Sequence, residues 1–306
     1  MVSNKGNHFR VNTVRWFTLG LGLLLLAACM PKEIPLPTPL PPPKPAKVAV
    51  VLGAGASRGF AHVGVLKVLE GQKVPIDLVV GTSAGSFVGS LYASGVEAFL
   101  LQKMALALQK DDVVDLTIPD NGFIRGEKLE NFVNKAVRQI PLERMKTPFR
   151  AVATNIQTGE ETVFATGNTG KAVRASCSIP GVFQPVKIGD KAYVDGGVVS
   201  PVAVDAARKA GADVVIAVDI SAGVGGAMPQ GTLDTILQSI DIMHARIATI
   251  QLKSADVIIR PSVGHIGSSD FDKRNEAILE GEKAATQALP QIRQILEKLR
   301  QEGRLP

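Results

Sequence analysis

The stretch IDLVVGTSAGSFVGSLYAS, residues 76–94, decides the fold. Ile76–Val80 is a short apolar run, which is typical of a strand buried on both faces of a sheet. A helix is predicted over about 84–94, so the chain must turn sharply between the two elements. The turn, Gly81–Gly85, matches G-x-S-x-G. Glycine at its two ends removes side chains that would collide with the strand and the helix beside the central serine.

That central serine, Ser83, is a candidate nucleophile. The helix that begins behind it directs free N–H groups and the positive end of its dipole toward an oxyanion. The motif alone is weak evidence because the chain contains 30 glycines, but the predicted strand before it and helix after it add weight. The structural alternative is a tight turn in which Ser83 is the N-cap of the helix.

A loop of small residues, Gly53–Gly59 (GAGASRG), follows another predicted buried strand, Val48–Leu52. Backbone N–H groups in such a loop can approach a ligand oxygen closely, which suits a dinucleotide phosphate site or the oxyanion hole of acyl transfer. The dinucleotide fingerprint fails because Arg58 stands where its third glycine would be, and a Walker A sequence is missing. In an oxyanion hole, this loop would supply one donor and the N–H of Ala84 another. Arg58 could brace the loop, contact an anionic head group or lie on the surface.

Histidine is a poor candidate for the general base. Three histidines lie beyond the N-terminal leader: His62, His244 and His265. His62 precedes the nucleophile and is expected to pack or to cap a helix. His244 lies inside a predicted amphipathic helix, so a Ser-His-Asp triad is possible only through His265, in a Gly/Ser-rich loop.

A carboxylate offers the alternative base. The sequence Asp195-Gly196-Gly197 follows a short predicted strand, Ala192–Val194, and its glycines permit the close approach of another backbone turn. An aspartate within hydrogen-bond reach of Ser83 could take its proton directly if burial raised the aspartate pKa. By itself, Asp-Gly-Gly is most often a turn.

The rest of the chain alternates between strand and helix patterns. Further strands are predicted at 150–155, 161–164, 213–220 and 256–260, and further helices at 62–70, 97–109, 127–140, 202–210, 232–253 and 275–301. This alternation predicts an α/β fold with three layers, α/β/α, around a mostly parallel central sheet.

The N-terminal residues read as a targeting segment and a spacer. Residues 1–16 carry three basic residues and no acid, and residues 17–28 are uncharged and rich in leucine, as in a secretory signal peptide. The run ends in Leu-Ala-Ala before Cys29, which resembles the lipobox of bacterial lipoproteins, whereas the alternative is an ordinary signal peptide. The resemblance implies cleavage before Cys29 and its lipidation, which would anchor the chain stably. The proline-rich residues up to 47 predict an extended spacer.

Composition excludes several classes of protein. The 306 residues are 45% hydrophobic and include only two cysteines, which excludes a disordered chain and a disulfide scaffold. The formal charge of +6 falls to +3 without the three basic residues of the leader, and the rest are interleaved with acids. No nucleic-acid partner is therefore expected. Cys177 is expected to be a small buried apolar residue.

The loop, the G-x-S-x-G turn and Asp-Gly-Gly, in this order, resemble the patatin-like phospholipase family, whose members carry G-G-G-x-R/K-G, G-x-S-x-G and D-G-G/A. The resemblance runs from about Val48 to Ala210 and includes flanking sequence such as residues 59–66, 122–126 and 176–183. It implies that Ser83 is the nucleophile and Asp195 the proton acceptor. The implied oxyanion hole comprises Gly55, Ala56, Ser57 and Ala84, and the implied motif glycines and arginine are Gly53, Arg58, Gly59, Gly81, Gly85, Gly196 and Gly197.

One departure from the family pattern concerns the loop. Ala54 and Ala56 replace the first and third family glycines, and alanine keeps its N–H group but tolerates a positive φ at a cost of about 1 kcal/mol. The hole could therefore be tighter or differently angled, which bears more on the rate than on the reaction class.

These features predict a serine acyl hydrolase that cleaves fatty-acyl esters of phospholipids or lysophospholipids through an acyl-enzyme, without a metal or organic cofactor. The alternatives are an acyltransferase on the same fold and a non-catalytic envelope lipoprotein. The expected organisation is a signal peptide over 1–28, lipidated Cys29 and spacer over 29–47, a catalytic domain over 48–210, and a C-terminal α/β part over 211–306 on the same domain. The protein is expected on the periplasmic side of the envelope, and at the outer membrane because Met30 replaces the aspartate associated with inner-membrane retention.

Overall fold

A computed structural model describes Met1 and residues 43–118, 121–222 and 228–306. The expected signal peptide, the expected lipidation at Cys29 and most of the expected spacer lie outside these residues.

The described strands form one eight-stranded sheet in the order β5-β6-β3-β2-β1-β7-β8, with β4 paired to β3. Neighbours within the run β3-β2-β1-β7-β8 pair in parallel. The strands β4 and β6 run antiparallel to β3, and β5 runs antiparallel to β6. The strands are β1 (Val48–Leu52), β2 (Leu78–Thr82), β3 (Phe149–Asn155), β4 (Glu161–Phe164), β5 (Val186–Ile188), β6 (Lys191–Asp195), β7 (Val214–Val218) and β8 (Val257–Ile259).

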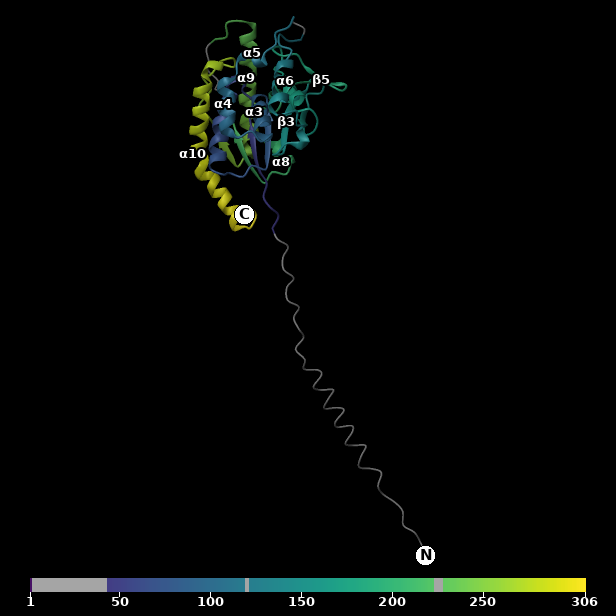
Figure 1. Ribbon diagram of the computed structural model, residues 1–306, viewed down its shortest axis with the longest axis vertical. Helices are drawn as coiled ribbons and strands as arrows, with labels where there is room; N and C mark the ends of the chain where they lie inside the picture. Colours follow the sequence, from purple (N-terminus) through teal and green to yellow (C-terminus); the bar gives the residue numbers. More distant parts are fainter. Residues whose placement is uncertain (2–42, 119–120, 223–227) are drawn as a thin grey trace. The chain divides into compact units, whose positions relative to one another are not determined.

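Helices cover both faces of this sheet (Figure 1). The described α-helices are α2 (Phe60–Gly71), α3 (Ala84–Ala93), α4 (Ala98–Ala107), α5 (Lys110–Val113), α6 (Glu127–Ala136), α7 (Thr169–Ser176), α8 (Val204–Lys209), α9 (Thr232–Gln251) and α10 (Arg274–Gln301). The described 3-10 helices are η1 (Ala56–Gly59), η2 (Leu142–Arg144), η3 (Gly196–Val198), η4 (Leu252–Ser254) and η5 (Phe271–Lys273).

The central strand β1 shows why two helical layers form. All five of its residues are buried, and successive side chains point to opposite faces. Val48, Val50 and Leu52 join the core cluster with α2, α3, α4, α6 and α10. Ala49 and Val51 join the cluster with α8 and α9. The predicted three-layer α/β/α fold with a mostly parallel sheet is thereby confirmed, with a mixed edge at β4, β5 and β6.

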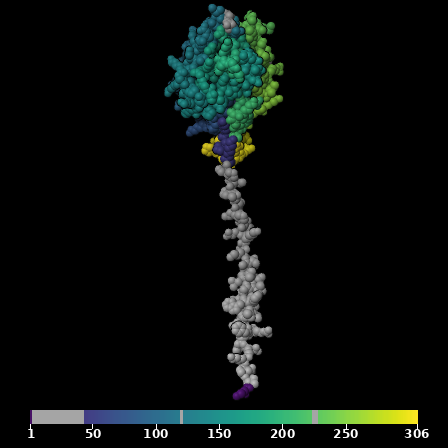
Figure 2. Space-filling model, turned by 90° about the vertical axis from the view of Figure 1, so that its right-hand side faces the viewer, coloured from purple at the N-terminus to yellow at the C-terminus, as the bar shows by residue number. Residues whose placement is uncertain are grey.

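The two ends of the described body meet at the amino end of β1. The N–H of Ala46 donates to the carbonyl of Arg304 at 2.8 Å, and the Arg304 guanidinium contacts Asp213 at 2.7 Å. Figure 2 shows the last residues of the chain (yellow) beside the segment that leads into β1 (purple). Ala46 is buried and the N–H of Lys47 donates to Asp213, so the packed body begins before residue 48.

Several element boundaries differ from the predicted ones. β1 and β4 have the predicted ends, but β2 begins two residues later than predicted and includes Thr82. The helix predicted over 127–140 ends at Ala136, because Arg138 and Gln139 adopt positive φ angles of 54° and 60°. Neither α7 nor the three-residue β5 was predicted, since both are short and carry few large apolar residues.

Candidate functional site

Ser83 lies at a strained corner between β2 and α3. Its φ of 54° and ψ of −124° fall outside the regions that L-residues normally adopt. A Cβ on Gly81 would stand 2.5 Å from the carbonyl oxygen of Gly85, and a Cβ on Gly85 would overlap the carbonyl of Leu52. The two motif glycines therefore allow the strand and helix to meet closely enough to hold the serine at this corner.

The register of the sheet brings Asp195 to the same place. Thr82 pairs with Val152 of β3, so Ser83 is level with Ala153, and Asp195 pairs with Ala153 from the other side. Strand β3 lies between the two, so the backbones at Ser83 and Asp195 are two strand spacings, about 9.5 Å, apart. The two side chains extend toward each other across this distance. Ser83 Oγ donates a hydrogen bond to Asp195 Oδ2 at 2.5 Å.

Burial makes Asp195 a stronger base than an ordinary aspartate. Its side chain is 2% exposed, and burial raises its pKa from 3.8 to about 7. The hydrogen bonds that its carboxylate accepts from Ser83 and from the N–H of Gly197 act in the opposite direction. The carboxylate can therefore accept the serine proton near neutral pH.

Hydroxyl groups that the sequence did not single out hold both residues in place. Ser176 Oγ accepts from the N–H of Ser83 at 2.9 Å and donates to the carbonyl of Val152 at 2.5 Å. Thr154 Oγ1 donates to the carbonyl of Asp195 at 2.9 Å. The only sequence signal for Ser176 was its place in the family-like stretch 176–183, and Thr154 had none.

Three expected oxyanion donors are free in the described part of the chain. The N–H groups of Gly55, Ala56 and Ala84 have no acceptor among the described residues. A Cβ on Gly59 would stand 2.5 Å from Ala84 Cβ, so this glycine lets the loop approach α3. Ala56 has a φ of 48°, so the expected backbone cost falls on this alanine, whereas Ala54 avoids a positive φ.

Ser57 does not fit the expected role of oxyanion donor. Its N–H and its Oγ both donate to the carbonyl of Ser268, at 3.3 and 2.9 Å. This interaction ties the loop to the segment before η5 and leaves the Ser57 N–H engaged. Of the four N–H groups inferred from the sequence as oxyanion donors, those of Gly55, Ala56 and Ala84 remain, and that of Ser57 does not.

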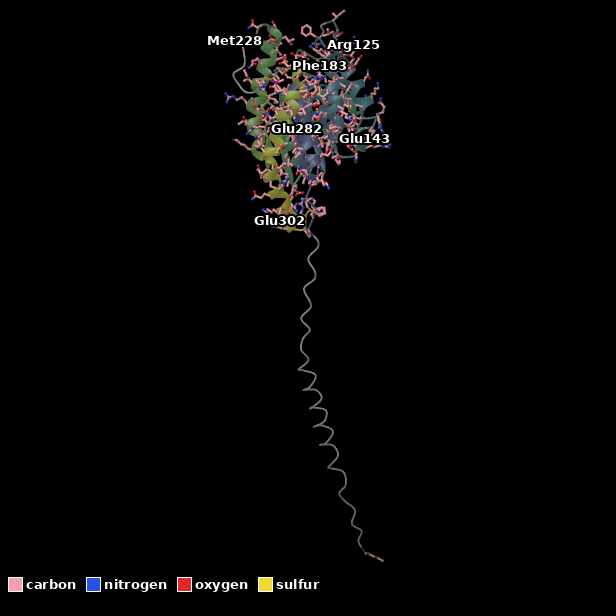
Figure 3. All side chains as sticks on the ribbon, turned by 60° about the vertical axis from the view of Figure 1, so that its left-hand side comes forward. Arg125, Glu143, Phe183, Met228, Glu282 and Glu302 are labelled. Atoms are coloured by element: carbon pink, nitrogen blue, oxygen red, sulfur yellow. The ribbon has the colours of Figure 1, made fainter. Side chains whose placement is uncertain are left out.

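Two cavities border Ser83 in the described ranges. The larger has a volume of about 460 Å³ and lies among apolar side chains of α2, α3, α4 and α6. The smaller, of about 20 Å³, lies between the small-residue loop, Asp195 and α9. Figure 3 shows Phe183, which lines the larger cavity, at one end of the domain, with Glu302 at the other. Ser83 and Ala56 line both cavities.

The sequence profile of the patatin-like phospholipase family matches residues 50–208. The chain belongs to this family. The patatin-like fold and the class predicted for the enzyme, a lipid acyl hydrolase, are supported by this match.

Curated relatives of this patatin-like domain are much longer proteins. Lysophospholipase nte1 of Aspergillus oryzae is 30% identical over 290 residues, covering 84% of this chain and 18% of the relative. Human patatin-like phospholipase domain-containing protein 6 is 35% identical over 179 residues, covering 56% of this chain and 13% of the relative. The chain thus spans less than a fifth of these relatives. Among solved structures, VipD from Legionella pneumophila is similar at a TM-score of 0.44 and 14% identity, covering 87% of this chain and 72% of VipD.

Arg58 holds the small-residue loop in place from inside the domain. Its side chain is 2% exposed and pairs with Asp241 of α9 at 2.5 Å. It also donates to the carbonyls of Ile220 and Ile266, at 3.1 and 3.3 Å. Of the three roles considered for Arg58, bracing the loop is the one that this burial supports, since a guanidinium enclosed in this way cannot reach a head group in solvent.

The three histidines beyond the leader have different surroundings. His62 is buried, its Nε2 lies 2.8 Å from the carbonyl oxygen of Gly53, and burial lowers its pKa to about 4. His265 pairs with Glu276 at 2.6 Å on the surface and lines neither cavity, so the triad considered through it is not formed. His244, set aside in the sequence as part of a helix, lines the smaller cavity together with Ser83 and Asp195.

Other features of the described residues bear on cofactors and membranes. Cys177 is buried as expected, and burial raises the pKa of its thiol. Within the described ranges, no group of three or more His, Cys, Asp or Glu side chains is placed to hold a metal ion. None of the helices described is both long enough and apolar enough to cross a bilayer.

Proposed function

We propose that this domain is a serine acyl hydrolase that releases fatty acids from phospholipids or lysophospholipids through an acyl-enzyme. The observation that carries the proposal is the 2.5 Å hydrogen bond from Ser83 Oγ to buried Asp195, at the junction of an apolar cavity and a polar one. The names of the relatives, which include lysophospholipases, point to the same substrate class.

The chemistry follows from the groups at this junction. Asp195 accepts the proton of Ser83 as Oγ attacks the ester carbonyl, and free N–H groups of the loop and of Ala84 stabilise the oxyanion that forms. The tetrahedral intermediate collapses by breaking the bond to the alcohol, which takes the proton from Asp195 as it leaves. The fatty acyl group remains as an ester of Ser83 until water hydrolyses it.

The larger cavity fits the acyl part of such a substrate. Along α3, the side chains of Ala84, Phe87, Val88 and Leu91 line it at helical spacing. They follow the cavity for about 10 Å from the nucleophile, given the rise of 1.5 Å per helical residue. An acyl chain placed here exchanges water for apolar side chains, which favours binding by about 0.8 kcal/mol for each buried methylene.

Apolar side chains also surround the opening of the larger cavity. Leu116, Phe123 and Leu233 line it and are 80%, 48% and 44% exposed. Exposed apolar groups at a binding-site opening favour a substrate that is presented at a lipid surface. This supports a membrane lipid over a small water-soluble ester as the substrate.

The test compares the full chain with Ser83→Ala in release of fatty acid from mixed micelles of lysophospholipid and detergent. We expect Ser83→Ala to lose at least 10³-fold in kcat/KM, because covalent catalysis requires the hydroxyl. Ser90→Ala is the matched control, since it removes another buried hydroxyl from α3, one that donates to the carbonyl of Phe87 away from the cavities. Unchanged turnover in Ser83→Ala would refute the proposal.

We also propose that Cys29 is lipidated and holds the domain at the periplasmic side of the envelope, with the outer membrane favoured. The support is the sequence pattern of basic leader, apolar run and small residues before the cysteine. Cells fed a labelled fatty acid should label the wild-type chain but not Cys29→Ala. Persistent label on the variant would exclude this anchor.

A further inference from the structure

The smaller cavity has the size and the surroundings of a water site. Its volume of about 20 Å³ is sufficient for one water molecule, which needs about 10–15 Å³ and two to four polar partners. Ser83, Asp195 and His244 all line it. A water molecule here would lie beside the nucleophile.

Among the residues that line the smaller cavity, His244 stands out because one of its ring nitrogens has no hydrogen-bond partner among the described residues. The residue is 7% exposed, and this nitrogen, Nε2, is buried. A buried polar atom without a partner typically costs about 1–3 kcal/mol of folding stability. This cost favours a bound molecule that hydrogen-bonds to Nε2.

The nitrogen lies close to the proposed base. A Cβ on Gly197 would overlap Nε2 of His244 and stand 3.1 Å from Oδ1 of Asp195. The absent side chain at this glycine therefore lets the imidazole pack against the backbone beside the carboxylate. The second glycine of Asp-Gly-Gly thus admits the ring of His244 as well as donating its N–H to Asp195.

The electrostatics of the site keep the imidazole neutral. Burial lowers the pKa of His244 to about 4, with Asp241 acting to raise it and Arg58 to lower it. A neutral ring has one nitrogen that can accept a hydrogen bond, as a water-holding group requires.

We propose that His244 positions the water that hydrolyses the acyl-enzyme. The inference rests on the proposed serine acyl hydrolase. One hydrogen of the water is donated to His244 Nε2, while Asp195 removes the other as a proton when the water oxygen attacks the acyl carbonyl carbon. The tetrahedral intermediate then breaks the bond between that carbon and Ser83 Oγ. Asp195 returns its proton to Oγ, and the fatty acid is released.

This role makes His244 a positioning residue for the second half of the reaction only. In the first half, Asp195 deprotonates Ser83 and no water reacts. Loss of His244 should therefore slow the hydrolysis of the acyl-enzyme and leave its formation nearly unchanged. It should also reduce the advantage of water over an added alcohol as the acyl acceptor.

The experiment follows the full chain with a p-nitrophenyl fatty-acyl ester. The variants are His244→Leu and His244→Gln, and His265→Leu is the control because it removes a surface imidazole that lines neither cavity. The readouts are the burst of p-nitrophenol, the steady-state rate, the mass of the intact protein, and the ratio of methyl ester to fatty acid in methanol.

We expect His244→Leu to lower the steady-state rate at least 10-fold and to form an acyl adduct at close to one equivalent. Its burst rate should stay within about 3-fold of the acylation rate of the wild type, and its share of methyl ester should rise. His244→Gln, which keeps an acceptor, should recover much of the steady-state rate, and His265→Leu should match the wild type.

Two outcomes would overturn the assignment. One is an equal fall of acylation and deacylation in folded His244→Leu, and the other is an unchanged product ratio with no adduct. If His244→Leu fails to fold, His244→Met fills the same space with a flexible side chain and has the same expected results. Failure of the proposed function is a separate result, namely an active Ser83→Ala or an adduct on another residue.

Discussion

The two cavities that meet at Ser83 differ in almost every respect. The larger is walled mainly by apolar side chains of α2, α3, α4, α6 and α9, and the smaller by Asp195, His244, the loop braced by Arg58 and apolar side chains of α9. Under the proposed function, one side takes up the apolar chain of the substrate, whereas the other holds and moves protons. The difference indicates that substrate selection and chemistry are carried by separate groups, so that mutations on each side should have separable effects.

The largest effect is expected on the polar side, at Asp195. Asp195→Asn should lower kcat/KM by about 10⁴-fold, since the amide cannot accept the proton of Ser83. Fatty-acid release under substrate-limited conditions measures this. A loss of less than 10-fold would show that another group is the base. The smaller cavity would then not be where the proton transfer takes place.

The pH dependence sharpens the same prediction. Because the pKa of Asp195 is raised to about 7, kcat/KM should rise about tenfold per pH unit below pH 7 and level off above it. The folded protein also binds this proton more tightly than the unfolded chain, whose aspartate pKa is near 3.8. The stability from this group is fully present below about pH 4 and is lost as pH rises through about 7. Asp195→Asn should remove this slope, which thermal unfolding between pH 5 and pH 8 detects.

Arg58 should show the next largest effect, on stability as well as on activity. Arg58→Met leaves Asp241 without its partner and two carbonyls without donors, which should cost about 3–5 kcal/mol of unfolding free energy. Chemical denaturation measures this cost. The control Arg125→Met removes an exposed arginine whose contact with Glu127 is 3.5 Å long, and should cost less than about 1 kcal/mol. An equal loss of unfolding free energy in the two variants would argue against a stabilising role for the buried contacts of Arg58.

On the apolar side, a change at Leu91 should alter selectivity and spare the chemistry. Leu91 lies two turns along α3 from Ala84. Leu91→Phe places a larger side chain in the distant part of the larger cavity and so reduces the space there. Hydrolysis of long-chain esters should fall about 10-fold, while that of butyryl esters should change less than 2-fold. The control Leu100→Phe alters an exposed residue of α4 outside the cavity. Parallel losses for short and long esters would contradict the division between the two sides.

The smallest effect is expected at the opening of the apolar cavity. Leu116→Asp places a charge where an apolar side chain is 80% exposed, which should reduce hydrolysis of vesicle lipid about 5-fold and leave monomeric esters unaffected. Leu279→Asp is the matched control, on α10 and outside both cavities. A loss on monomeric esters would show that Leu116 serves substrate binding and not contact with a lipid surface.

Much of the polar side could be predicted from the sequence, because its residues follow strand ends in short motifs. The G-x-S-x-G turn predicted the corner at Ser83, and a base without imidazole was inferred from Asp195-Gly196-Gly197, before the sheet register placed the two side chains together. The boundaries of β1 and β4 were also predicted, since continuous apolar runs and turn residues define them.

The parts of the site that the sequence did not predict depend on contacts between distant segments. His244 lies 49 residues after Asp195, and only the packing of α9 brings it to the smaller cavity. Ser57 was assigned as a donor because nothing in the loop reveals that Ser268 accepts its N–H. The walls of the larger cavity come from several helices whose apolar periodicity predicts a buried face but not which groups that face meets.

The position of the chain ends has a consequence for how the domain can be tethered. Ala46 and Arg304 meet at the amino end of β1, whereas Ser83 and the small-residue loop follow the carboxyl ends of β2 and β1. A tether attached ahead of residue 43 therefore pulls on the pole opposite the catalytic corner. If Cys29 carries the proposed lipid, the anchored segment therefore enters the domain at the end of the sheet opposite Ser83.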